Sequence, residues 1–190
     1  MPKHAFKEWA VICRALADGR QALILRKGGI DESGGEFHLE SQRFWLYPTY
    51  VHQQRDGIKP EALPLLDQVE AERPPAGVVR LSHFVHLAGV YHVHQPAGAL
   101  VLGDLHLWSR ETVQARFAYR RPGLYVLPVR VYRAREVFEL PEIAAYAGCR
   151  SWVELERELP TEGATPVLAE EAFRNVLRSL DARLNPTALA

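Results

Sequence analysis

The stretch VVRLSHFVHLAGVYHVHQ, residues 78–95, carries the clearest signal for the fold. It is rich in valine and aromatic residues, which favour strands. Ala88 and Gly89 interrupt it, so we predict strands at about 78–87 and 90–94. The stretch also holds four of the chain's eight histidines, which makes it a candidate metal site as well.

Further strands are predicted at 98–103 and 123–133. Ser109 is a candidate N-cap for a helix through about Arg120, because its side chain can accept from a first-turn amide. The string SWVE at 151–154 matches a capping box and predicts another helix. Near the C-terminus, apolar residues at helical spacing predict a docking helix; they are Phe173, Val176, Leu177, Leu180 and Leu184. Together these elements predict an α+β fold with a mainly antiparallel sheet or small barrel flanked by helices.

The first seventy residues are harder to assign. Two apolar runs flank Asp18 and Gly19, which favours a hairpin, although a helix followed by a strand also fits. Pro48 is expected to open a short helix, and Pro60 a second one. Residues 1–190 are expected to form a single domain, and 73–77 is the best boundary if it has two lobes, 1–72 and 78–190.

Composition excludes several protein classes. The chain has 190 residues, 47% of them hydrophobic, and no net charge, as is typical of a soluble globular protein. Its apolar runs are far below the ~20 residues of a membrane span, and the N-terminus lacks a signal-peptide core. We therefore expect a cytoplasmic protein without membrane contact. Cys13 and Cys149 lie far apart, which argues against a disulfide framework and cysteine-rich zinc sites.

The histidine-rich stretch is a metal site only under one geometric condition. If it is one continuous strand, His86 lies about 20 Å from His92, so only His92 and His94 can cooperate. A three-residue hairpin loop would group His86 with them, and a two-residue turn would group His83 instead. Three imidazoles are the ligands of some catalytic zinc sites. Because no HExxH motif supports this pattern, we expect no metal and no cofactor.

The segment LRKGGIDESGGEF, residues 25–37, is a candidate anion site. Arg26 and Lys27 end a predicted strand, and Gly28 and Gly29 allow close approach to backbone amides. The segment contains neither a Walker A motif nor GxGxxG. A hairpin end followed by a flexible loop is the alternative interpretation.

Two further segments supply candidate binding residues. In YPTYVHQQ, residues 47–54, His52 and Gln53 could form a polar pocket near Arg26, although a solvent-facing helix explains the string equally well. Between residues 110 and 135 the sequence has seven arginines against one glutamate. Clustered guanidinium groups neutralise phosphates, and neighbouring aromatic rings can stack on bases. The candidates in this segment and just before it are His106, Trp108, Arg116 and Arg120.

Four strings in order along the chain support a resemblance: FKEWAVICRAL, LILRKGGIDE, FWLYPTYVHQ and GCRSWVEL. Together they resemble an uncharacterised bacterial domain-of-unknown-function family, whose members are sometimes found with an Mrr-type restriction endonuclease domain. The resemblance implies a restriction or DNA-handling context. It also marks as signature residues Arg26, Lys27, Gly28, Gly29, Glu32, Pro48, Thr49, His52 and Gln53. No PD-(D/E)xK string is present, so a restriction role here would be binding or recognition.

Three functions compete on this basis. The leading hypothesis is a non-enzymatic module that binds nucleic acid, DNA or RNA, through the Arg26–Lys27 loop, His52, Gln53 and residues 106–135. The second is a metal-dependent hydrolase that uses His86, His92 and His94, with a carboxylate such as Glu32 as base. The third is an adaptor that binds a protein partner, or another copy of itself, through its acidic C-terminal helix.

Overall fold

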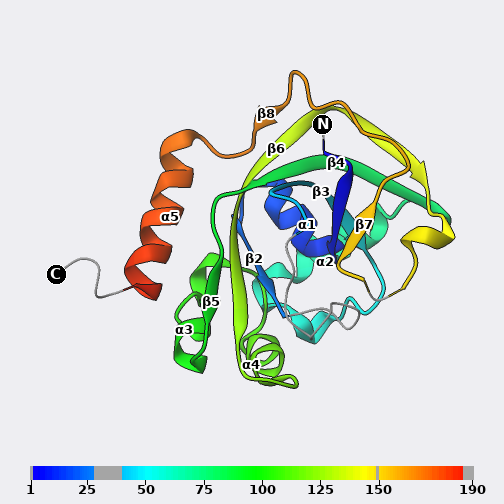
Figure 1. Cartoon of the computed structure of the whole chain (residues 1–190). Helices are drawn as coiled ribbons and strands as arrows, with labels where there is room; N and C mark the ends of the chain where they lie inside the picture. The colour runs from blue at the N-terminus through cyan, green and yellow to red at the C-terminus, as the bar shows by residue number, and fades with distance from the viewer. Residues whose placement is uncertain (1, 28–39, 149, 186–190) are drawn as a thin grey trace.

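The computed structural model describes residues 2–27, 40–148 and 150–185 (Figure 1). A curled sheet with strand order β2-β6-β4-β3-β1-β7 forms its centre, and β5 and β8 each pair with β6. Among the described strands, β1 and β3 pair in parallel and the other pairs are antiparallel. The bounds are β1 (His4–Trp9), β2 (Leu23–Arg26), β3 (Arg43–Thr49), β4 (Val78–Leu87), β5 (Tyr91–Val93), β6 (Leu124–Pro141), β7 (Trp152–Glu154) and β8 (Thr165–Pro166). The predicted α+β fold with a mainly antiparallel sheet is confirmed.

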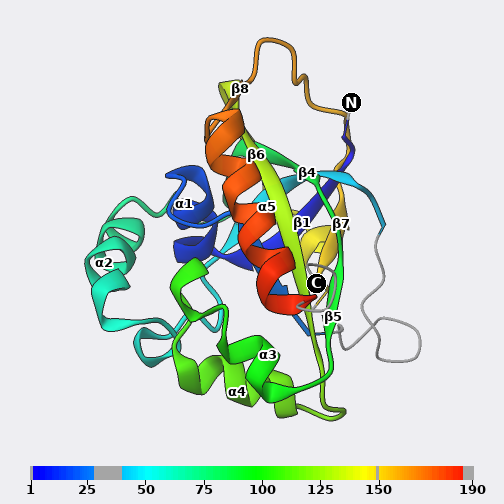
Figure 2. The same cartoon turned by 90° about the vertical axis from the view of Figure 1, so that its left-hand side faces the viewer.

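Helices flank this sheet (Figures 1 and 2). Their bounds are α1 (Ala10–Ala17), α2 (Leu63–Ala71), α3 (Pro96–Leu100), α4 (Arg110–Ala118) and α5 (Glu170–Leu184). Short 3-10 turns are η2 (Arg55–Gly57), η3 (Pro60–Ala62), η4 (Gly103–Leu105) and η5 (Ala144–Tyr146). Figure 2 shows α5 lying along β6. Phe173 and Leu180 of α5 are buried, which confirms the C-terminal docking helix.

The core has two parts because side chains alternate across the sheet. On β3, Phe44 and Leu46 belong to the larger cluster, with α1 and α4, while Trp45 and Tyr47 belong to a second cluster on the other face. β3 is therefore buried on both faces. It pairs with β4, so strands from before and after the 73–77 segment share one sheet. Within the described residues, no helix is both long and apolar enough to cross a membrane.

The predicted hairpin at Asp18 and Gly19 is wrong, because residues 10–17 form helix α1 and the alternative is correct. Gly19 has φ 69°, and its N–H donates to Leu16 O while that of Arg20 donates to Ala15 O. This pair of bonds is a Schellman helix end. The Asp-Gly dipeptide thus ends a helix instead of turning a hairpin.

Three other local predictions are also wrong. Residues 98–103 include most of α3, because Pro96 sets the first helical turn. Residues 152–154 form β7 instead of a capped helix, because they pair with β1 and Trp152 packs on Phe6 at 4.9 Å. Pro48 lies within β3. By contrast, the strands at 78–87, 90–94 and 123–133 are confirmed, as is the helix after Pro60. Ser109 caps α4 as predicted, accepting from Thr112 N at 3.2 Å, although α4 ends at Ala118, before Arg120.

Candidate functional site

A pocket of about 580 Å³ lies where the ends of β1, β2 and β3 meet the segments 72–80 and 142–148 and Arg150. Pockets of this size hold small molecules or single groups of a larger ligand. The described lining has six cationic side chains against three carboxylates, so it favours a negatively charged ligand. They are Lys7, Arg26, Arg73, Arg80, Arg116 and Arg150, against Glu8, Glu72 and Glu142.

Arg116 reaches this pocket from α4. Its guanidinium lies 3.6 Å from the ring centroid of Trp108 and 5.6 Å from that of Trp9, and Nη1 donates to Leu25 O at 3.3 Å. Burial lowers the pKa of Arg116 to about 10, against the opposing attraction of Glu8. Arg116 is therefore a cation at neutral pH, and stacking on an aromatic ring fixes the plane of its guanidinium.

Arg26 enters the pocket from the end of β2. Its Nη2 donates to Ser151 Oγ, just before β7, and its guanidinium lies 4.9 Å from the centroid of the Phe6 ring. Because β2 and β7 are the two ends of the strand order, Arg26 links the edges of the curled sheet. Its buried Nε has no hydrogen-bond partner in the described part of the chain.

Glu8 is the most buried charged group of the lining, at 2% exposure. Its Oε1 accepts from Trp9 N at 2.8 Å, while its buried Oε2 has no partner among the described residues. Nearby, burial and then Glu142 raise the pKa of Tyr47 well above its usual value. Sequence reasoning missed both residues. The signal for Glu8 is a single acid inside the apolar string AFKEWAVI.

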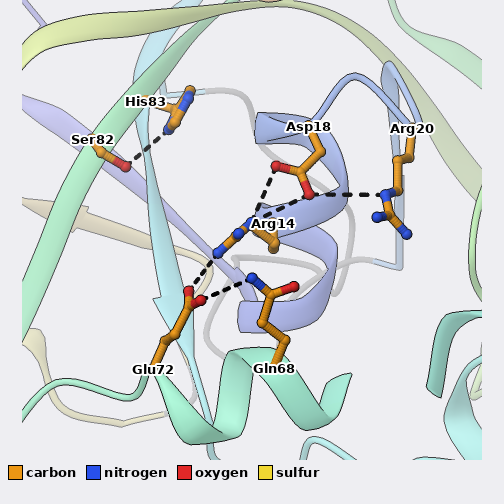
Figure 3. Close-up of polar contacts among 7 residues, drawn as sticks. All are labelled: Arg14, Asp18, Arg20, Gln68, Glu72, Ser82 and His83. Atoms are coloured by element: carbon orange, nitrogen blue, oxygen red, sulfur yellow. Dashed lines mark hydrogen bonds and ion pairs between the residues drawn. The ribbon is translucent and has the colours of Figure 1, made fainter. Parts of the chain in front are cut away.

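An ion-pair cluster holds the rim of the pocket beside α2 (Figure 3). Arg14 of α1 donates to Glu72 at 2.6 Å and to Asp18 at 3.1 Å, and Gln68 donates to Glu72 at 2.8 Å. The hydrogen bonds from Gln68 and Arg14 hold the pKa of Glu72 below its usual value. This cluster joins α1 to the segment that begins at Glu72, and so fixes one wall of the pocket.

Three of the predicted binding residues line this pocket, and a fourth packs against one of them. Arg26 and Arg116 are described above, and His52 lines the rim with a φ of 63°. Trp108 packs under Arg116. The predicted sites at 26–53 and 106–120 thus converge, although Arg26 and Arg116 lie 90 positions apart.

The other predicted binding residues lie elsewhere. Lys27 Nζ donates to the carbonyl of Phe117, in the last turn of α4, and to those of Arg121 and Gly123 beyond it. Gln53 accepts from Val11 N at 2.9 Å and donates to Glu70, so it caps α1. Arg120 is exposed beside Tyr119, and His106 lines a second, smaller cavity. Gly28, Gly29 and Glu32 lie outside the described residues.

The histidine-rich stretch does not reverse direction. β4 and β5 both run antiparallel to β6 on successive segments, with His86 opposite Arg130 and Tyr91 opposite Val126. Both hairpin alternatives at Ala88 and Gly89 are therefore excluded, so the condition for a three-histidine site is not met. His92 and His94 lie with ring centroids 3.9 Å apart. In the described parts of the chain, no three His, Cys, Asp or Glu side chains gather as a metal site would require.

Comparison with protein-family models identifies the chain. A model described as a domain of unknown function, DUF1802, matches residues 5–179. The chain belongs to the DUF1802 family. A search of curated proteins finds no relative of this DUF1802 chain.

Solved structures similar to the DUF1802 chain include ASCH from Zymomonas mobilis. It is 12% identical with a TM-score of 0.46, and the match covers 92% of this chain and 93% of that one. A serine-to-alanine mutant of the same protein is 14% identical with a TM-score of 0.43, covering 94% and 99%. A similarity at this level does not extend to function.

Proposed function

We propose that the chain is a non-enzymatic nucleic-acid-associated module whose 580 Å³ pocket binds one unstacked nucleotide of a single strand. The observation that carries this proposal is the pair Arg26 and Arg116, two guanidinium groups from distant elements that line one pocket with an excess of cations. Guanidinium groups pair with phosphate oxygens through forked hydrogen bonds.

The pocket also has aromatic rings in its lining. Trp9 and Tyr50 are partly exposed and are the rings on which a base would stack, while Tyr47 and Tyr146 are buried. Base–aromatic stacking contributes about 1–3 kcal/mol per base and tolerates any sequence. Aromatic rings beside phosphate-binding cations are typical of proteins that bind unstacked nucleotides.

The size of the pocket supports a single-stranded partner. A volume of about 580 Å³ suits one nucleotide, and a base must leave the duplex stack before it can enter such a pocket. Glu8 Oε2 and Arg26 Nε, an acceptor and a donor on lining residues, have no hydrogen-bond partner among the described residues. A restriction context, as the family resemblance implies, would then rest on recognition of a strand and not on its cleavage.

Fluorescence anisotropy with labelled single-stranded DNA and RNA of mixed sequence tests this function. We expect saturable binding that weakens between about 50 and about 200 mM salt, because phosphate contacts release counterions. Each oligonucleotide should be recovered intact after incubation with divalent cations. Absence of binding at low salt overturns the proposal, and cleavage overturns its non-enzymatic part.

A further inference from the structure

A second cavity, of about 80 Å³, lies between α3, η4 and the start of α4. Its described lining has four polar side chains, each a cation or a potential N–H donor, and no carboxylate: Lys59, His106, Trp108 and Arg110. Backbone pairing brings Lys59 close to Trp108. Lys59 N donates to Leu107 O at 2.9 Å, and Ile58 and Trp108 form an isolated antiparallel β-bridge.

The buried nitrogens of this cavity lack protein partners. His106 is 3% exposed and Trp108 is fully buried. Neither ring nitrogen of His106, nor the indole Nε1 of Trp108, has a hydrogen-bond partner in the described residues. About 90% or more of buried polar groups in folded proteins are satisfied, so three such nitrogens on two lining residues call for a partner that the described part of the protein does not supply.

The helix that begins here adds to the positive potential. Arg110 is the first residue of α4, and Ser109 Oγ accepts from Thr112 N. The other amides of the first turn lack intrahelical partners, and the N-terminal end of a helix carries partial positive charge. Asp104, whose charge also acts on His106, is itself paired with Arg183 at 2.8 Å.

We propose that this cavity binds a phosphate group, at a site separate from the nucleotide pocket. One water needs about 10–15 Å³ of such volume, so 80 Å³ admits a compact oxyanion but not a nucleotide. Lys59 and Arg110 supply charge, and His106 and Trp108 supply N–H donors. Burial and the nearby Lys59 lower the pKa of His106 to about 4, and a bound anion would raise it again.

NMR of ¹⁵N-labelled protein tests this site through the Trp108 indole N–H signal, assigned with Trp108→Phe. Titration with inorganic phosphate, at constant ionic strength in chloride, should shift this signal saturably in the millimolar range. His106→Leu and Lys59→Met should each weaken the phosphate affinity by at least about tenfold. Lys59→Met is included because Lys59 is partly exposed, so this substitution disturbs folding less than the substitution of the buried His106. Arg178→Ala, on exposed α5 and outside the lining of both cavities, should leave the affinity unchanged.

A second arm separates free phosphate from the phosphate of a strand. In one outcome, inorganic phosphate leaves the signal unchanged while a single-stranded oligonucleotide shifts it. If Lys59→Met then abolishes that shift, the bound phosphate belongs to the strand and the proposed site stands. If neither probe shifts it, or if both variants respond like wild type, the cavity holds water and the proposal is wrong. Because Trp108 also packs under Arg116 of the nucleotide pocket, Lys59→Met assigns the shift: Lys59 lines this cavity and not the nucleotide pocket.

Discussion

Gly57→Ala should destabilise the chain by forcing Trp9 out of place. An ideal Cβ at Gly57 would lie 2.5 and 2.6 Å from Cη2 and Cζ3 of Trp9, so the ring must move by about 1 Å to reach ordinary contact distance. That ring cannot move freely, because it packs on Trp108 at 4.6 Å and under Arg116. Overpacking of this kind costs about 1–3 kcal/mol, or about 2–12 °C in Tm for a chain of this length.

Thermal unfolding followed by circular dichroism measures this cost. Gly89→Ala is the matched control, because its Cβ would lie 3.8 Å or more from the nearest side chains. We expect the control to stay within about 0.5 kcal/mol of wild type. Gly57→Ala should also weaken oligonucleotide binding, since Trp9 lines the pocket. Equal Tm values for Gly57→Ala and Gly89→Ala would contradict the claim that Trp108 and Arg116 hold the Trp9 ring in place.

Three further predictions concern stability. Arg183 holds the pKa of the exposed Asp104 at about 2, so Arg183→Gln should lower Tm by about 1–4 °C at pH 7, and this loss should vanish as pH falls from about 4 to 2. Burial lowers the pKa of His83 to about 4, so the unfolded chain takes up a proton first as pH falls below 6.5. Urea unfolding should therefore show stability falling between pH 6.5 and 4, by up to about 3 kcal/mol from this group, with a flatter profile for His83→Gln. Leu180→Ala, at a fully buried position of α5, should cost about 2–5 kcal/mol in urea unfolding, against much less for the partly exposed Leu177→Ala.

The sequence was sufficient where the deciding signals are local. The apolar spacing of α5, the Ser109 cap and the strand at 78–87 were all predicted correctly. Prediction from the sequence failed where one segment is compatible with two kinds of secondary structure. Residues 10–19 fit a hairpin or a helix, and the bond from Val11 N to Gln53, 42 positions away, supports the helix. Residues 151–154 match a capping box, yet pairing with β1 makes them a strand.

The residues of the candidate site likewise divide into those that local sequence could predict and those that it could not. Arg26 and His52 were predicted to share one pocket, but Arg116 was assigned to a separate surface, because only the packing of α4 against β2 brings it to that pocket. Lys27 and Gln53 were chosen for the same chemistry. Polar side chains that hold backbone groups look no different in sequence from those that hold a ligand. Glu8 was missed because a lone acid in a strand carries no motif.

The most direct test of nucleotide binding compares two arginine variants by anisotropy with a single-stranded oligonucleotide. Arg116→Met keeps the packing on Trp108 but removes the guanidinium, while Arg178→Ala removes the same charge from exposed α5, outside the pocket lining. We expect Arg116→Met to weaken binding about 10- to 150-fold and to flatten the salt slope by about 0.7. Arg178→Ala should stay within about twofold of wild type. Equal effects of the two variants would contradict a phosphate contact in the pocket.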